Sequence, residues 1–166
     1  MPEAFVANLN DNARQQMIGL LNDRLADAID LTLAVKQAHW NVKGPSFIGI
    51  HELLDEVADR CREHADLIAE RCVILGGQAR GTSQAVVSET DLEPYPADAQ
   101  HQSRHVEALK ERFMAFGASL RRSIEAAGDA GDEDTADLFT EVSRAVDKDA
   151  WFIGAHNASP DDAPAV

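Results

Sequence analysis

The stretch from His51 to Glu70 most constrains this chain, because it carries two pairs of potential metal ligands in an uninterrupted helical pattern. The pairs are His51/Asp55 and Asp66/Glu70, and their i,i+4 spacing places both members of each pair on one face of a helix. At about 100° per residue, all four side chains share a flank. A rise of about 1.5 Å per residue separates His51 from Asp66 by about 22 Å, which is too far for one metal ion. A complete site therefore needs two antiparallel copies of the helix, related by a two-fold axis near residues 60 and 61.

The apolar stripe of the same stretch lies about a third of a turn away from these ligands. The ligand flank is therefore not the face that packs against the chain's own core. Cys61 and Cys72 fall on the stripe about 16 Å apart, so we expect small core residues and no disulfide within a chain. The stripe consists of Phe47, Ile50, Leu54, Ala58, Cys61, Ala65, Ile68, Cys72 and Leu75.

Four amphipathic segments predict four long helices. They cover residues 11–41, 47–77, about 98–128 and 133–157. The first link is short, and Ser46 is predicted to cap the second helix. The second link runs from Gln78 to about Ala97, with a short helix expected around 83–88. This pattern predicts an all-α, ferritin-like four-helix bundle with a long crossover connection between helices two and three. We expect one domain over 1–166, with short tails at 1–10 and 158–166.

The composition is strongly acidic, with 29 Asp and Glu against 15 Lys and Arg, for a net charge of −14. Such a surface repels nucleic acid and concentrates cations, although solubility or adaptation to salt explains it equally well. The sequence has no basic-then-apolar leader and no apolar run near 18 residues. These features predict a cytoplasmic protein that does not cross a membrane.

His39 lies at the end of the first helix and adds a second imidazole to the ligand set. Two imidazoles and three carboxylates form a mixed nitrogen and oxygen set that suits iron better than magnesium or calcium. The chain has no Glu-x-x-His motif, which disfavours a two-iron site inside one subunit. A single i,i+4 acid pair is usually a solvated surface, so a purely structural helical assembly stays an alternative.

Several motifs together carry a family resemblance. They are Ala38-His-Trp-Asn-Val-Lys-Gly-Pro-Ser-Phe47, His51-Glu-Leu-Leu-Asp55, Asp66-Leu-Ile-Ala-Glu70, Leu75-Gly-Gly77, Gly81-Thr-Ser-Gln84, Tyr95-Pro96, Asp134-Thr-Ala-Asp137 and Asp147-Lys148 with Trp151-Phe152. In these segments the sequence closely resembles the Dps family, the ferritin-like DNA-binding proteins from starved cells. The resemblance implies a hollow homo-dodecamer that stores ferric mineral and has a ferroxidase site at each two-fold interface.

The resemblance also implies roles for individual residues. His39, His51 and Asp55 would come from one subunit and Asp66 and Glu70 from its partner, with two irons per site and hydrogen peroxide or oxygen as oxidant. Beyond these ligands, the family match concerns Trp40, Lys36, Asp134 and Asp137. Trp40 would donate an electron to stray oxidants or simply pack at the interface. Lys36 would pair a carboxylate, move protons or be solvated. Asp134 and Asp137 would line a three-fold iron-entry pore, although acids are ordinary at a helix start.

The leading prediction is a ferroxidase and iron-storage protein, and the alternative is a nucleoid-compacting DNA-binding protein with secondary metal binding. The first ten and last ten residues contain no Lys or Arg, so DNA binding is expected to be weak or absent. His64 is expected to lie off the ligand flank. The i,i+4 pair His101/His105 is expected to be exposed and to lack a third ligand.

Overall fold

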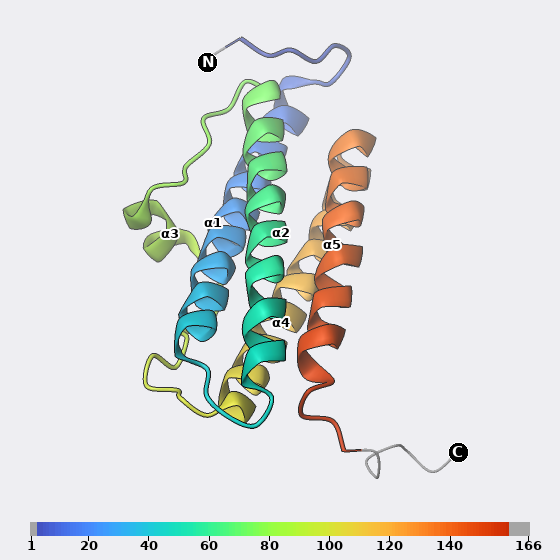
Figure 1. Cartoon of the computed structure of the whole chain (residues 1–166). Coiled ribbons are helices and arrows are strands. Elements are labelled where there is room, and N and C mark those ends of the chain that lie inside the picture. Colours follow the sequence, from blue (N-terminus) through green and yellow to red (C-terminus); the bar gives the residue numbers. More distant parts are fainter. Residues whose placement is uncertain (1–2, 160–166) are drawn as a thin grey trace, which may run out of the picture.

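A computed structural model describes residues 3–159 of the chain (Figure 1). Its helices are α1 (Asp11–Asn41), α2 (Phe47–Ile74), α3 (Ser83–Glu89), α4 (Gln102–Asp129) and α5 (Glu133–Gly154). Within 3–159 the only strand-like feature is an isolated bridge between Lys43 and His101. None of the described helices has the length and apolar character needed to cross a membrane. Most of the predicted tail from 158 onward lies outside the described residues.

The four long helices form a bundle in which α1 packs mainly against α2, and α4 packs mainly against α5. The connection between α2 and α4 runs along the length of the bundle, and α3 stands beside α1 at its edge (Figure 1). The structure thus confirms the predicted four-helix bundle with a long crossover connection. It also confirms the short helix expected around 83–88, which is α3.

The turn between α1 and α2 is held by a distant part of the chain. Ser46 is the N-cap residue of α2, as predicted, but its side chain makes no capping hydrogen bond within the described structure. Its backbone N–H instead donates to the side chain of Gln102, at 2.8 Å. Gly44 has a φ of +151°, and a Cβ there would lie 2.5 Å from Gln102 Oε1. The turn therefore depends on close approach to α4, which a local capping rule does not include.

The core fills the space between the four long helices. Its largest fully buried side chains include Phe113, Phe116 and Phe139. Most of the predicted stripe on α2, including Cys61 and Cys72, is buried as expected. Phe47 is an error in that prediction, because its side chain is 43% exposed. Phe47 is the first residue of α2, and the centroid of its ring lies 5.2 Å from that of His51.

Ion pairs between partly buried arginines and buried aspartates join α2 to α5. Arg60 donates from Nε and Nη2 to the carboxylate of Asp149, with the shortest contact at 2.7 Å. Near the other end, Arg71 donates to Asp132 at 2.7 Å and to the Thr135 hydroxyl at 2.9 Å. The Asp132 carboxylate also accepts from the Thr135 N–H and so caps α5. These pairs hold α2 in register with α5.

Candidate metal centre

His39 on α1 and His51 on α2 face each other across the turn. Their rings are stacked, with centroids 3.8 Å apart and planes 20° apart. His39 Nδ1 lies 2.8 Å from the carbonyl oxygen of His51, and His51 Nδ1 lies 2.8 Å from the carbonyl oxygen of His39. Because a carbonyl oxygen only accepts, each Nδ1 is the donor, which leaves Nε2 as the ring atom available to bind a metal. Metal-binding histidines are commonly oriented by a hydrogen bond of this kind.

Asp55 lies one helical turn after His51, beside the two rings. Its Oδ1 is 3.9 Å from His39 Nε2 and 2.6 Å from Lys36 Nζ. The hydrogen bond from the Lys36 ammonium is the main cause that lowers the pKa of Asp55; desolvation opposes the shift, and the nearby positive charge of Lys36 adds to it. Asp55 is therefore a charged carboxylate that Lys36 holds in place beside the imidazoles.

Lys36 also contacts Trp40, with Nζ 5.7 Å from the centroid of its ring. The indole is 67% exposed. The structure therefore brings together five predicted residues at one end of the α1–α2 pair. They are Lys36, His39, Trp40, His51 and Asp55.

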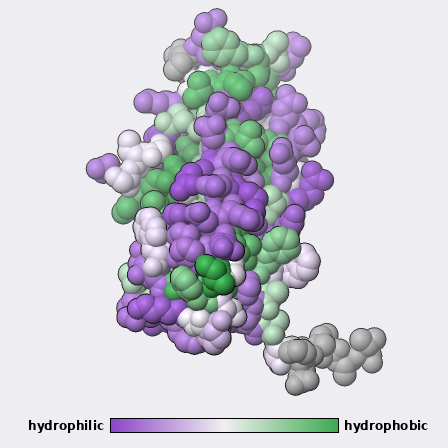
Figure 2. Space-filling view, in the orientation of Figure 1, coloured by the Kyte–Doolittle hydropathy of each residue, from purple (hydrophilic) through white to green (hydrophobic). Residues whose placement is uncertain are grey.

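Asp66 and Glu70 lie farther along α2, and both are exposed. Asp66 borders an apolar groove of about 330 Å³ between α1 and α2. Glu70 borders a second hollow of about 450 Å³, beside the exposed side chains of Val73 and Ile74. In Figure 2, hydrophilic side chains cover the middle of the face that carries α2, with hydrophobic patches above and below.

A single chain does not bring Asp66 and Glu70 to the histidines. Across residues 3–159, no group of three or more His, Cys, Asp or Glu side chains is arranged to hold a metal ion. One copy of the chain thus presents two separated halves of the predicted ligand set. The histidine half is preorganised by backbone hydrogen bonds, and the carboxylate half is exposed beside apolar surface.

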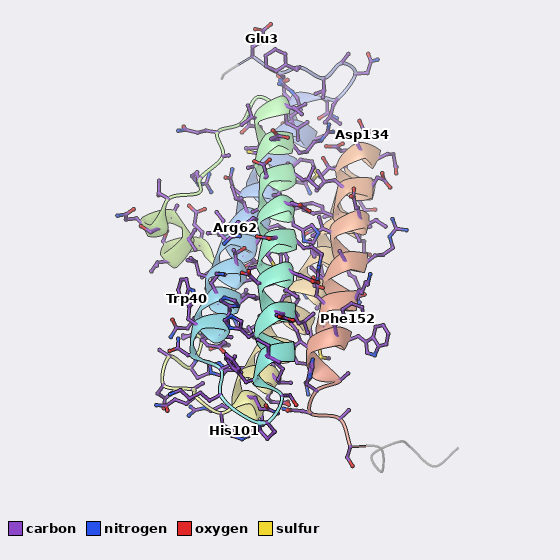
Figure 3. The ribbon with its side chains drawn as sticks, in the orientation of Figure 1. Glu3, Trp40, Arg62, His101, Asp134 and Phe152 are labelled. Carbon is purple, nitrogen blue, oxygen red and sulfur yellow. The ribbon has the colours of Figure 1, made fainter. Side chains whose placement is uncertain are left out.

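Asp134 and Asp137 lie at the start of α5, and both are exposed. Asp134 sits at the opposite end of the bundle from Trp40 (Figure 3). Its Oδ2 lies 3.8 Å from Arg71 Nη1. The two predicted pore residues therefore lie away from the histidine half of the candidate metal centre, with side chains open to solvent.

The predicted exposure of the His101/His105 pair is wrong for His105, whose side chain is completely buried. Tyr95 from the crossover lies over it, with the phenolic oxygen 2.6 Å from His105 Nδ1. The i,i+4 pattern of α4 contains no signal for this contact, because the covering residue comes from a distant loop. His64, expected off the ligand flank, is buried, and burial lowers its pKa.

Comparison with known proteins agrees with this architecture. Residues 18–159 match the family of ferritin-like domains. The chain is 49% identical over 149 residues to the DNA protection during starvation protein of Agrobacterium fabrum, covering 90% of this chain and 92% of that protein. The solved Dps of Mycobacterium smegmatis in its tetragonal form superposes with a TM-score of 0.92 at 32% identity, covering 97% of both chains. DpsA14 of Streptomyces coelicolor gives 0.91 at 36% identity, covering 99% of this chain and 98% of that one.

The four-helix bundle, its crossover connection and the match of residues 18–159 to the ferritin-like domain place the fold in the ferritin-like class. Within that class, sequence and structure agree on one group of relatives. The chain belongs to the Dps family.

Proposed function

We propose that this protein oxidises Fe(II) at sites shared between two subunits and stores the ferric product inside a homo-dodecameric shell in the cytoplasm. Membership of the Dps family supports iron storage or DNA protection in general. The observation that carries the finer proposal is the reciprocal bonding of His39 and His51. It leaves two Nε2 atoms free beside the Asp55 carboxylate.

The donor set suits iron as the substrate. Neutral imidazoles bind Fe(II), and carboxylates, as harder donors, favour Fe(III) once an electron has left. With hydrogen peroxide as the oxidant, two Fe(II) ions each give one electron and two protons are taken up, so that two water molecules form. Lys36 lies within hydrogen-bond distance of Asp55 and is placed to supply a proton there. Oxygen is the other candidate oxidant.

A second subunit would complete each site. Asp66 and Glu70 are exposed beside apolar hollows, and Leu33 in the same groove is also exposed. Such apolar surface on both sides of a polar flank favours burial against another protein surface. A two-fold axis would bring the partner subunit's Asp66 and Glu70 to the histidines and create two identical sites, with two irons in each.

We assign Asp134 and Asp137 to an iron-entry pore. Both are solvent-exposed carboxylates near the start of α5, with Asp134 on its first turn. A three-fold axis at this end would bring three copies of each carboxylate together and focus a negative potential on the opening. Fe(II) would be drawn inward along that potential.

The sharing of each site is tested by mixing two inactive variants, His51→Ala and Asp66→Asn. Each variant alone is expected to oxidise Fe(II) with peroxide more than about tenfold more slowly than the parent. Loss of a residue that only supports a metal ligand already costs about tenfold, and these two variants each lose a proposed ligand itself. When the two are dissociated and reassembled together, about half of the dimers are mixed. Each mixed dimer has one intact site of two, so about one quarter of the parental activity returns. The measurement is the iron oxidised per subunit after anaerobic Fe(II) loading.

Asp59→Asn is the matched control, because Asp59 is an exposed acid on the same helix that pairs only locally with Arg62. It is expected to keep the parental rate. If the single variants assemble normally and mixing restores nothing, each site does not use residues from two chains. If both variants oxidise Fe(II) at the parental rate, the ligand assignment is wrong.

A further inference from the structure

Tyr95 and His105 form a hydrogen-bonded pair between the crossover connection and α4. The phenolic oxygen lies 2.6 Å from His105 Nδ1, and the two rings are 18° from parallel. Burial lowers the pKa of His105 and raises the pKa of Tyr95. The imidazole is therefore neutral at neutral pH and the phenol keeps its proton. In the tautomer that carries its hydrogen on Nε2, the phenol donates to Nδ1. The metal centre described above does not use this pair.

The pair lies at the same end of the bundle as the histidine half of the metal centre. Lys43, just after α1, donates its N–H to the Gln100 carbonyl at 2.9 Å and accepts from the Gln102 N–H at 2.8 Å. His105 also lines a small hollow with Ile50, which precedes His51 in the sequence. Figure 3 shows His101, one helical turn before His105, toward the same end as Trp40.

We propose that Tyr95 is an electron donor that quenches one-electron oxidants formed at the metal centre, with His105 as its proton acceptor. The proposal rests on the proposed function, because iron oxidation is what supplies the oxidant. The oxidant is of the hydroxyl-radical class, formed when hydrogen peroxide takes a single electron from one Fe(II). The pair would limit oxidation of the protein when only one iron of a site is filled.

The step balances in electrons and protons. The phenol of Tyr95 loses one electron to the hydroxyl radical, which becomes hydroxide, and the phenolic proton moves to His105 Nδ1. A neutral tyrosyl radical and an imidazolium ion result. A further Fe(II) then returns one electron and becomes Fe(III), while the proton moves back to the phenolic oxygen. Burial is the main cause that disfavours the imidazolium; hydrogen bonds to the backbone of Ala99 and Asn41 oppose it and the Arg104 charge adds to it, so that the pKa of His105 is lowered and the return is favoured.

The charges near the two candidate donors explain why proton transfer matters. Lys36 Nζ lies 5.7 Å from the Trp40 ring, so a positive charge on the oxidised indole would be repelled. The Arg112 guanidinium lies 6.0 Å from the Tyr95 ring and would repel a positive phenol in the same way. Tyr95 avoids that cost only if its proton leaves with the electron. His105 is the group positioned to take it.

The experiment exploits the fact that Tyr95 is the only tyrosine of the sequence. The assembled protein, labelled with ring-deuterated tyrosine, is loaded with less than one Fe(II) per site, mixed with hydrogen peroxide and frozen. Its electron paramagnetic resonance spectrum is expected to show a tyrosyl radical whose hyperfine lines change with the label. The signal should vanish in Tyr95→Phe. In His105→Asn, which keeps an acceptor oxygen near the Nδ1 position but no base, the yield should fall at least about tenfold.

His101→Asn is the matched control, because His101 is an exposed histidine at the start of the same helix and Asn is also a good N-cap. It should give the parental radical yield. A parental signal that arises only from tryptophan would overturn the proposal. So would an equal tyrosyl yield in His105→Asn and in the parent.

A second arm separates this inference from the proposed function. A photo-excited ruthenium complex with persulfate supplies a one-electron oxidant without iron. A tyrosyl absorption that forms in the parent and falls in His105→Asn supports the pair, even if the iron titration fails. Tryptophan oxidation alone, in parent and variants alike, rejects it whatever the iron chemistry. Failure of Fe(II) oxidation with an intact photochemical signal counts against the proposed function alone.

Discussion

At the scale of single residues, the candidate metal centre is defined by the hydrogen bonds that orient its two imidazoles. The i,i+4 spacing on α2 was enough to predict the flank of His51 and Asp55. The family resemblance supplied His39. Neither the spacing nor the resemblance predicted the reciprocal hydrogen bonds from each Nδ1 to the other residue's carbonyl oxygen. These bonds form only because the turn brings the two backbone segments together. The same limit applies to the hydrogen bond between His105 and Tyr95, because Tyr95 comes from the crossover connection.

His64 offers a test of pH-dependent stability at one residue. Burial is the main cause that lowers its pKa from the ordinary 6.5, although the charge of Asp149 opposes the shift. Below about pH 6.5 the unfolded chain therefore binds more protons at His64 than the folded chain does. The free energy of unfolding decreases as the pH is lowered, until the pH is below the lowered pKa of His64 in the folded chain. His64→Gln is expected to show a shallower fall than the parent.

The measurement is the midpoint of thermal unfolding of parent and His64→Gln between about pH 8 and pH 5, at one protein concentration. His156→Gln serves as the control, because His156 is exposed. It should follow the parental curve. Parallel curves for the parent and His64→Gln would mean that His64 is not held neutral by burial.

At the scale of helices, the amphipathic pattern predicted most boundaries closely. The first helix was predicted over 11–41 and is found there, whereas the last ends at Gly154 instead of about 157. Local periodicity places a helix because the signal repeats every turn. It does not show which ion pairs join one helix to another, and Arg60 with Asp149 and Arg71 with Asp132 were not foreseen.

Two aspartates on α5 allow a matched comparison of such pairs. Asp149 is 1% exposed and accepts hydrogen bonds from both Nε and Nη2 of Arg60, whereas Asp147 is half exposed and pairs with Arg121 at the surface. Asp149→Ala is expected to lower the free energy of unfolding by about 3 kcal/mol, because it leaves a partly buried guanidinium without its partner. Asp147→Ala should cost less than about 0.5 kcal/mol.

Urea unfolding of both variants and the parent at equal protein concentration measures the difference. The contrast between the two aspartates is the informative quantity, since assembly contributes to all three values. If both variants lose the same free energy of unfolding, burial does not determine how much the Arg60–Asp149 pair contributes to stability.

At the scale of the whole molecule, charge governs the expected behaviour toward DNA. The net charge of −14 opposes approach to a phosphate backbone, and no Lys or Arg occurs in the first or last ten residues. We expect weak or no binding of duplex DNA at neutral pH. A gel-shift assay of the assembled protein at low salt, where electrostatic binding is strongest, is the measurement. Tight, stoichiometric complexes there would contradict the expectation and favour the nucleoid-compacting alternative.

The pairing of helices has a consequence for how the molecule opens. Since α1 contacts mainly α2 and α4 contacts mainly α5, the bundle consists of two hairpins that interact more within themselves than with each other. Such units commonly unfold as separate cooperative segments in native-state hydrogen exchange. His39 and His51 both belong to the α1–α2 hairpin, and their mutual bonds close its turn. A fluctuation that loosens α4 and α5 would therefore leave the two imidazoles of the candidate metal centre hydrogen-bonded to each other's backbone.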